Sequence, residues 1–81
     1  MSARILIVED DPFIAMSLSV LLKKNNYYVV GIKDNAEDAW QVCLEEKPDL
    51  VLLDISLIGD KKGTWVGEHI KKESLPIKII Y

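Results

Sequence analysis

The chain has 81 residues, of which 49% are hydrophobic and 28% charged, and its formal net charge is −3. This length predicts one domain, residues 1–81, large enough to form a core without disulfides or metals, and the acidic balance argues against direct nucleic-acid binding. The single cysteine, Cys43, excludes an internal disulfide. Without a membrane-length apolar span or a leader segment, we expect a cytoplasmic protein with no membrane contact.

The first predicted strand is the apolar run Arg4–Val8, which ends on acidic residues. Asp11 followed by Pro12 is a strong helix start, and the helix should run to about Lys24. Its apolar residues form two neighbouring sets, one of Ile14, Leu18, Leu21 and Leu22 and the other of Phe13, Met16 and Val20. A helix that is apolar on two faces should be covered by more than the sheet alone.

The second predicted strand is Tyr27–Ile32, rich in aromatic and β-branched residues. Asn35 should cap the next helix, which must end near Lys47 because Pro48 disfavours helical geometry in the residue before it. The apolar positions of this helix repeat at helical spacing: Ala36, Ala39, Trp40, Cys43 and Leu44. We therefore read Cys43 as a buried apolar residue rather than a reactive thiol.

The third strand lies within Asp49–Leu57, where Leu50 to Leu53 is apolar at every position and Asp54 follows at once. Such a run suits a strand covered on both faces of a parallel sheet. A turn-rich loop follows, Leu57–Gly63, then a helix from Thr64 to about Ser74 with Val66, Gly67 and Ile70 facing inward, and a fourth strand over Ile77–Tyr81. This alternation of strands and helices predicts an α/β fold with a parallel sheet and right-handed crossovers.

Two strands that end in carboxylates indicate a cation site. If the first and third strands are neighbours, their ends lie about 4.8 Å apart, and Glu9, Asp10 and Asp54 crowd together. Two like charges at about 4 Å repel by roughly 4 kcal/mol at an effective dielectric constant near 20. Such a cluster must hold a proton, a water-rich gap or a cation. A hard divalent cation such as Mg²⁺ fits, and an ionised Asp beside it can attack phosphorus.

The segments Ile5–Pro12 and Pro48–Leu57, with Gly63 opening the next helix, resemble the receiver domain of two-component response regulators. The resemblance implies a flavodoxin-like, doubly wound sheet of strand order 2-1-3-4 and a phosphoacceptor module that is not an enzyme. It implies that Asp54 takes a phosphoryl group from a sensor histidine kinase or phosphotransfer protein. It also implies that Asp10 binds Mg²⁺ directly, that Glu9 acts largely through water, and that the Ser56 backbone carbonyl is a further ligand.

The chain departs from the family pattern in two ways. Ile58 stands where the family often has proline, and Gly63 comes one residue later than the commonest spacing. The chain also ends within the fourth strand, as about the first two-thirds of a receiver. It therefore lacks the family's switch Thr/Ser, the fifth strand with its phosphate-pairing Lys, and the last two helices. We expect this piece alone to be incompetent in signalling.

Two other functions are open on the sequence. A Mg²⁺-dependent phosphatase of the haloacid-dehalogenase type also uses an Asp at a strand end, but it needs a second Asp two residues on, where this chain has Ser56. The other alternative is a receiver-derived dimerisation module. In that case a homodimer would form through the edge of the fourth strand, where Ile77, Ile79 and Ile80 lie, or through the first-helix face of Phe13, Met16 and Val20.

Overall fold

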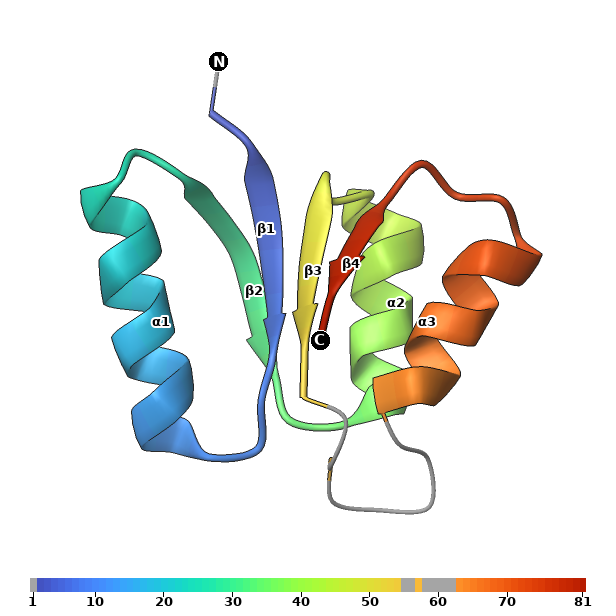
Figure 1. The fold of residues 1–81 in the computed structure, drawn as a ribbon, viewed down its shortest axis with the longest axis horizontal. Helices are drawn as coiled ribbons and strands as arrows, with labels where there is room; N and C mark the ends of the chain where they lie inside the picture. The colour runs from blue at the N-terminus through green and yellow to red at the C-terminus, as the bar shows by residue number, and fades with distance from the viewer. Residues whose placement is uncertain (1, 55–56, 58–62) are drawn as a thin grey trace.

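In the computed structural model, which describes residues 2–54, 57 and 63–81, strands and helices alternate along the chain (Figure 1). The elements are β1 (Arg4–Val8), α1 (Pro12–Lys24), β2 (Tyr28–Lys33), α2 (Ala36–Glu46), β3 (Leu50–Leu53), α3 (Gly63–Lys72) and β4 (Lys78–Ile80). All were expected, with small shifts at the ends of β2, α3 and β4. Of the loop expected over Leu57–Gly63, the structure describes only Leu57 and Gly63.

The strands form one parallel sheet in the order β2-β1-β3-β4, so β1 and β3 are central neighbours. Val8 pairs with Leu53, which brings the ends of these two strands to the same level. The β1–β2 pairing shifts by one residue between Ile5 and Leu6. This order confirms the expected α/β parallel fold and places the residues that follow β1 and β3 side by side.

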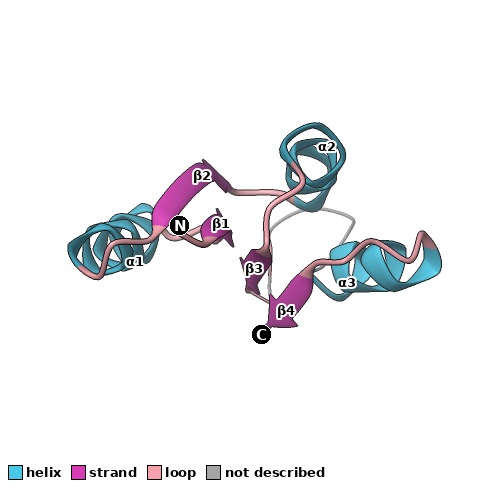
Figure 2. Cartoon of the chain, turned by 90° about the horizontal axis from the view of Figure 1, so that it is seen from above, coloured by secondary structure: helices cyan, strands magenta, loops and turns pink. Residues whose placement is uncertain are grey.

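Helices cover the two faces of the sheet unequally. Helices α2 and α3 pack on one face, and α1 lies on the other, against β1 and β2 (Figure 2). The core lies under α2 and α3 and is built from Leu6, Val8, Ala36, Ala39, Cys43, Val51, Leu53, Leu57, Val66, Ile70 and Ile77. In β3, Val51 and Leu53 are buried, whereas Leu50 and Leu52 are half-buried, because no described helix covers β3 on the α1 side. The continuous apolar run of β3 is therefore covered fully on one face only.

The helix ends follow from their capping residues. Asp11 accepts hydrogen bonds from the backbone N–H groups of Phe13 and Ile14 at 2.9 and 3.2 Å, with Pro12 in the first turn. Asn35 caps α2 by accepting from the N–H of Asp38 at 2.9 Å. Lys47, just before Pro48, takes a left-handed conformation with φ of 47° and ends α2. These three predictions are confirmed.

The expectation for α1 is wrong in one respect. Ile14 and Leu21 were expected on a covered face but are exposed, like Phe13, Met16 and Val20. The residues that α1 buries are the small Ala15 and Ser19, because small side chains let the helix lie close to the sheet. Leu44, expected on the apolar stripe of α2, is also exposed.

None of the described helices is long and apolar enough to cross a membrane.

Candidate functional site

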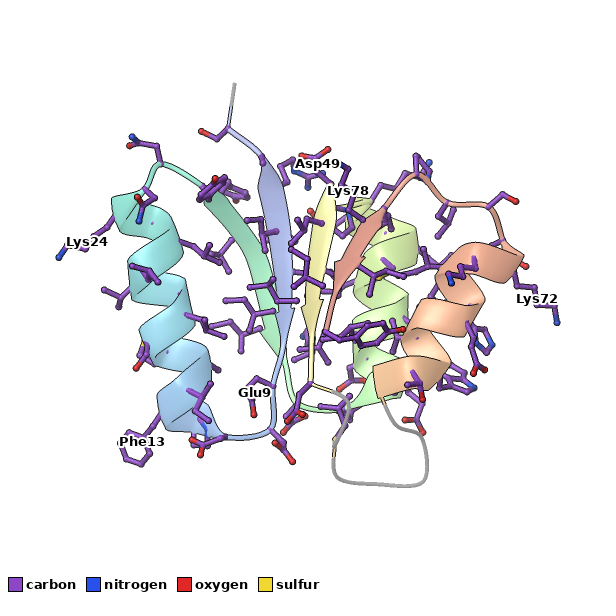
Figure 3. The ribbon with its side chains drawn as sticks, in the orientation of Figure 1. Glu9, Phe13, Lys24, Asp49, Lys72 and Lys78 are labelled. Atoms are coloured by element: carbon purple, nitrogen blue, oxygen red, sulfur yellow. The ribbon has the colours of Figure 1, made fainter. Side chains whose placement is uncertain are left out.

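Three carboxylates meet at the edge of the sheet where β1 and β3 end. Glu9 and Asp10 follow β1, and Asp54 follows β3, so the parallel pairing of these strands delivers all three to one place. One carboxylate oxygen from each residue lies within 4.8 Å of the other two. Figure 3 shows Glu9 at this edge, with Asp49 and Lys78 at the opposite edge. The convergence expected for Glu9, Asp10 and Asp54 is therefore present.

Backbone hydrogen bonds hold the ends of both strands in place beyond their last paired residues. The N–H of Glu9 donates to the carbonyl of Lys33 at 2.9 Å, and the N–H of Asp54 donates to the carbonyl of Val8 at 2.9 Å. The Glu9 carboxylate also accepts a hydrogen bond from the N–H of Asp11 at 3.1 Å. Glu9 and Asp54 are thus fixed relative to β1 by the sheet itself, which suits a preorganised site.

The crowding of carboxylates changes the acidity of Glu9. Burial raises the pKa of Glu9 above its ordinary value of 4.5, and the charge of Asp54 and hydrogen-bonding contacts with Asp54 and Asp10 raise it further. The hydrogen bond from Asp11 acts in the opposite direction. A cluster that favours a bound proton is also one that a cation would stabilise, because both relieve the same repulsion.

A hollow of about 470 Å³ runs from the acidic residues along the uncovered face of the sheet. Glu9 and Asp54 stand on its wall, together with apolar side chains from the sheet and from α1, among them Ile7, Leu18 and Leu52. The carboxylates are therefore open to a ligand that approaches this edge.

The remaining candidate residues lie away from this cluster or outside the described chain. Ser56, expected to offer its backbone carbonyl, is outside the described residues. Asp49 sits at the opposite edge, where it accepts a hydrogen bond from the N–H of Arg4 at 2.7 Å, a structural role. Cys43 is fully buried, as expected, and burial raises the pKa of its thiol to about 11.

His69 is half-buried, and its surroundings could not be read from sequence. Its ring lies 3.9 Å from the ring of Trp65 and 5.3 Å from that of Trp40, measured between centroids. Its Nδ1 atom lies 2.9 Å from the carbonyl oxygen of Trp65. This arrangement packs α3 on α2 and brings no second metal ligand to His69 among the described residues.

A parallel α/β sheet with carboxylates converging at the carboxyl ends of its central strands defines a class of proteins that bind ligands or cations at this edge. The model of the response regulator receiver domain family matches residues 5–81. The chain belongs to this family, which decides against the phosphatase alternative. Receiver domains are generally non-enzymatic signalling modules that partner histidine kinases.

Two relatives illustrate the match. The chain is 34% identical over 82 residues to the phyllosphere-induced regulator PhyR of Methylorubrum extorquens, with 99% of this chain and 31% of that protein covered. It is 35% identical over 77 residues to the transcriptional regulatory protein PdtaR of Mycobacterium tuberculosis, with 95% of this chain and 38% of that protein covered. The chain thus spans about a third of the length of the curated relatives that it matches.

Solved structures show the same fold. The response regulator PhyR from Brucella abortus is 31% identical, with a TM-score of 0.89, and the match covers 99% of this chain and 32% of that one. A DNA-binding response regulator of the LuxR family from Staphylococcus aureus is 29% identical, with a TM-score of 0.89, and the match covers 95% of this chain and 64% of that one.

Proposed function

We propose that this chain is the phosphoacceptor module of a two-component system, in which Asp54 receives a phosphoryl group and Mg²⁺ is bound at Glu9, Asp10 and Asp54. The observation that carries the proposal is the meeting of three carboxylates, with oxygens within 4.8 Å of one another, at the end of β1 and β3 in a receiver domain. The donor is a sensor histidine kinase or a phosphotransfer protein of the cytoplasm.

Asp54 is suited to act as the nucleophile. It follows the central strand β3, and its backbone N–H donates a hydrogen bond to the carbonyl of Val8, which fixes the position of Asp54 at the carboxyl end of the strand. In the transfer, an oxygen of Asp54 forms a bond to phosphorus as the bond between phosphorus and the donor histidine nitrogen breaks. The electron pair of that bond returns to the imidazole, which takes a proton. The product is an aspartyl-phosphate.

The donor set fits Mg²⁺, a hard cation that prefers oxygen ligands and binds through few carboxylates together with water and phosphate oxygens. Among the described residues, no lysine or arginine forms an ion pair with Glu9 or Asp10, so their charge is available to a cation. Asp10 and Asp54 would bind it, Glu9 would act largely through water, and the carbonyl of Ser56 would be a further ligand. The cation would supply shielding between the charge of Asp54 and that of the arriving phosphoryl group.

The test is to incubate the longest natural chain that carries these residues with a small phosphodonor and Mg²⁺. Phosphoaspartate is then trapped by reduction and mapped by mass spectrometry. We expect the label on Asp54, and its loss in Asp54→Asn, because the amide keeps the shape of the side chain but removes the nucleophilic charge.

Asp34→Asn is the matched control, since Asp34 is an exposed acid at the same edge but follows β2. This variant should be labelled as the unmodified chain is. Label on Asp49, on Asp60 or on Asp34, with Asp54 unmodified, would refute the assignment.

A further inference from the structure

The described positive charges of the molecule lie almost entirely at one edge of the sheet. Strands of a parallel sheet all end at the carboxyl edge, where the acidic cluster lies, and the connecting helices run back to the opposite edge. Seven described basic residues stand at the start of a strand or at the end of a helix, and so at the opposite edge: Arg4, Lys23, Lys24, Lys47, Lys71, Lys72 and Lys78. Figure 3 shows Lys24 and Lys78 away from Glu9.

Lys33 is the exception. It is the last residue of β2, and it is the only lysine or arginine that the described part of the chain places at the carboxyl edge. It pairs with Val8, and its backbone carbonyl accepts the hydrogen bond from the N–H of Glu9 at 2.9 Å. The sheet therefore fixes the backbone of Lys33 directly beside the start of the acidic cluster.

A hollow of about 420 Å³ joins Lys33 to the acidic cluster, between the starts of α1 and α2. Glu9 and Asp10 line this hollow, and so do Asp34 and Asp38. Among the described residues around the hollow, Lys33 is thus the single base against four acids.

Two of these four acids are engaged in the start of α2. The side-chain amide of Asn35 donates hydrogen bonds to Asp34 at 2.9 Å and to Asp38 at 3.0 Å. Lys33 is half-buried and forms no ion pair within the described chain. No direct contact cancels its charge, so this charge acts on its surroundings through space.

The physical effect of such a charge on a cation is repulsion. Neighbouring strands are about 4.8 Å apart, and the ammonium of lysine is a compact charge on a flexible four-carbon stem, so Lys33 can hold its charge within about 10 Å of a cation at Glu9 and Asp10. At this distance a unit charge changes the affinity for a divalent cation by about threefold when little salt is present.

We propose that Lys33 sets the affinity of the acidic cluster for Mg²⁺. Its ammonium has no lone pair and is not a ligand. It repels the cation through space, and in the metal-free chain it attracts the carboxylates instead. This inference rests on the proposed function, because it takes the acidic cluster to be the cation site.

Titration calorimetry of the 81-residue chain with Mg²⁺ at about 0.02 M salt measures the effect. Lys33→Gln should bind Mg²⁺ about threefold more tightly, and Lys33→Glu about tenfold, because the second change replaces repulsion by attraction. Lys33→Arg keeps the charge and should bind as the unmodified chain does. In about 0.5 M salt the gain of Lys33→Gln should disappear, because salt screens charges that are not in contact.

Lys78→Gln is the matched control, since it removes the same charge at the opposite edge of the sheet (Figure 3). Strand β1 has 5 residues, so the two edges are about 16 Å apart. Lys78→Gln should therefore change the affinity for Mg²⁺ by less than about 1.5-fold. Circular dichroism checks that each variant is folded.

The metal-free chain gives a second readout. In EDTA, Lys33→Gln should lower the melting temperature more than Lys78→Gln does, because the cluster loses its nearest described positive charge. In the Asp10→Asn background the loss from Lys33→Gln should be smaller, since one of the attracted charges is already gone. Equal losses in both backgrounds would contradict an interaction between Lys33 and Asp10.

The outcomes separate this inference from the proposed function. If Asp10→Asn weakens Mg²⁺ binding and Lys33→Gln leaves it unchanged, Lys33 has no such role and the proposed cation site stands. If the unmodified chain binds no Mg²⁺, both are wrong. An equal gain from Lys78→Gln would show that net charge matters and position does not. A gain from Lys33→Gln that persists in 0.5 M salt would show an effect of packing. Either of these two results overturns the inference.

Discussion

Burial and the crowding of carboxylates raise the pKa of Glu9 and so make the stability of the fold depend on pH. The pKa of Glu9 is raised, first by burial and then by Asp54, so the folded chain binds a proton at Glu9 more readily than the unfolded chain does. For such a group, the contribution to stability is fully present below the unfolded pKa, near 4.5, and is lost as the pH rises through the folded pKa. The ionised form of Glu9 therefore destabilises the metal-free fold relative to the protonated form.

We expect Glu9→Gln to raise the melting temperature of the metal-free chain at pH 7, because the amide keeps the shape and removes the charge. The gain should shrink as the pH falls and vanish below about pH 4.5, where the glutamate is protonated in both states. Calorimetric scans in EDTA from pH 4 to pH 8 measure it. A gain that is constant with pH would mean that the charge of Glu9 is not the cause.

A substitution of Asp10 tests the proposed metal site through its affinity for Mg²⁺. Asp10→Asn should weaken Mg²⁺ binding at least tenfold, because a hard cation loses a charged oxygen ligand and keeps only a neutral one. Titration calorimetry of the 81-residue chain measures the affinity, with Asp34→Asn as the control. Equal affinity of Asp10→Asn and the unmodified chain would contradict the assignment of Asp10 as a ligand.

At the residue level, the sequence predicts the acidic cluster because Glu9 and Asp10 come directly after one apolar strand and Asp54 directly after another. Only one geometric assumption is needed, that the strands before Glu9 and Asp54 are neighbours, and the pairing of Val8 with Leu53 supplies it. The contacts of His69 could not be predicted in this way, because they depend on how α3 turns against α2. Nothing in the spacing of Trp40 and Trp65 along the chain shows that both rings meet the same imidazole.

At the level of elements, the residues that cap the helices were easier to predict than the side of α1 that is buried. Asp11 and Asn35 fixed the starts of α1 and α2, because a capping side chain acts within its own first turn. The buried side of α1 was mispredicted, because large apolar residues occur all round this helix. The buried side of α1 is the side of Ala15 and Ser19, because these small side chains let the helix pack closely on the sheet, and the sequence of the helix alone does not show this contact.

Helix α3 meets β4 at Gly67, where a Cβ atom would come too close to the hydroxyl end of Tyr81. That hydroxyl is the far end of an exposed side chain, and the ring can turn away. We expect Gly67→Ala to raise the free energy of unfolding by up to about 1 kcal/mol, the helix preference of alanine over glycine, less the cost of moving Tyr81.

Urea denaturation measures this change, and Tyr81→Ala provides the background in which nothing blocks the new methyl group. The gain from Gly67→Ala should be larger in that background than in the unmodified chain. A loss of stability in both backgrounds would show that the hydroxyl of Tyr81 is not the cause of the loss.

At the level of the whole molecule, the parallel sheet and its order were predictable from the alternation of strands and helices together with the family resemblance. The unequal cover of the two faces was not evident from strand patterns, since β3 reads as apolar throughout. Only the assembled fold shows Leu52 at the hollow on the α1 side and Leu53 in the core under α2 and α3.

The central place of β1 in the sheet has a consequence for how the chain is made. Its Val8 pairs on one side with Lys33 and on the other with Leu53, so β1 is synthesised before both of its partners, and its pairing is complete only after β3 has been made. At about 5–20 residues per second, a ribosome needs seconds to deliver Leu53 after Val8. Throughout that interval β1, the most deeply buried of the described strands, has an unpaired edge on the side where β3 will bind.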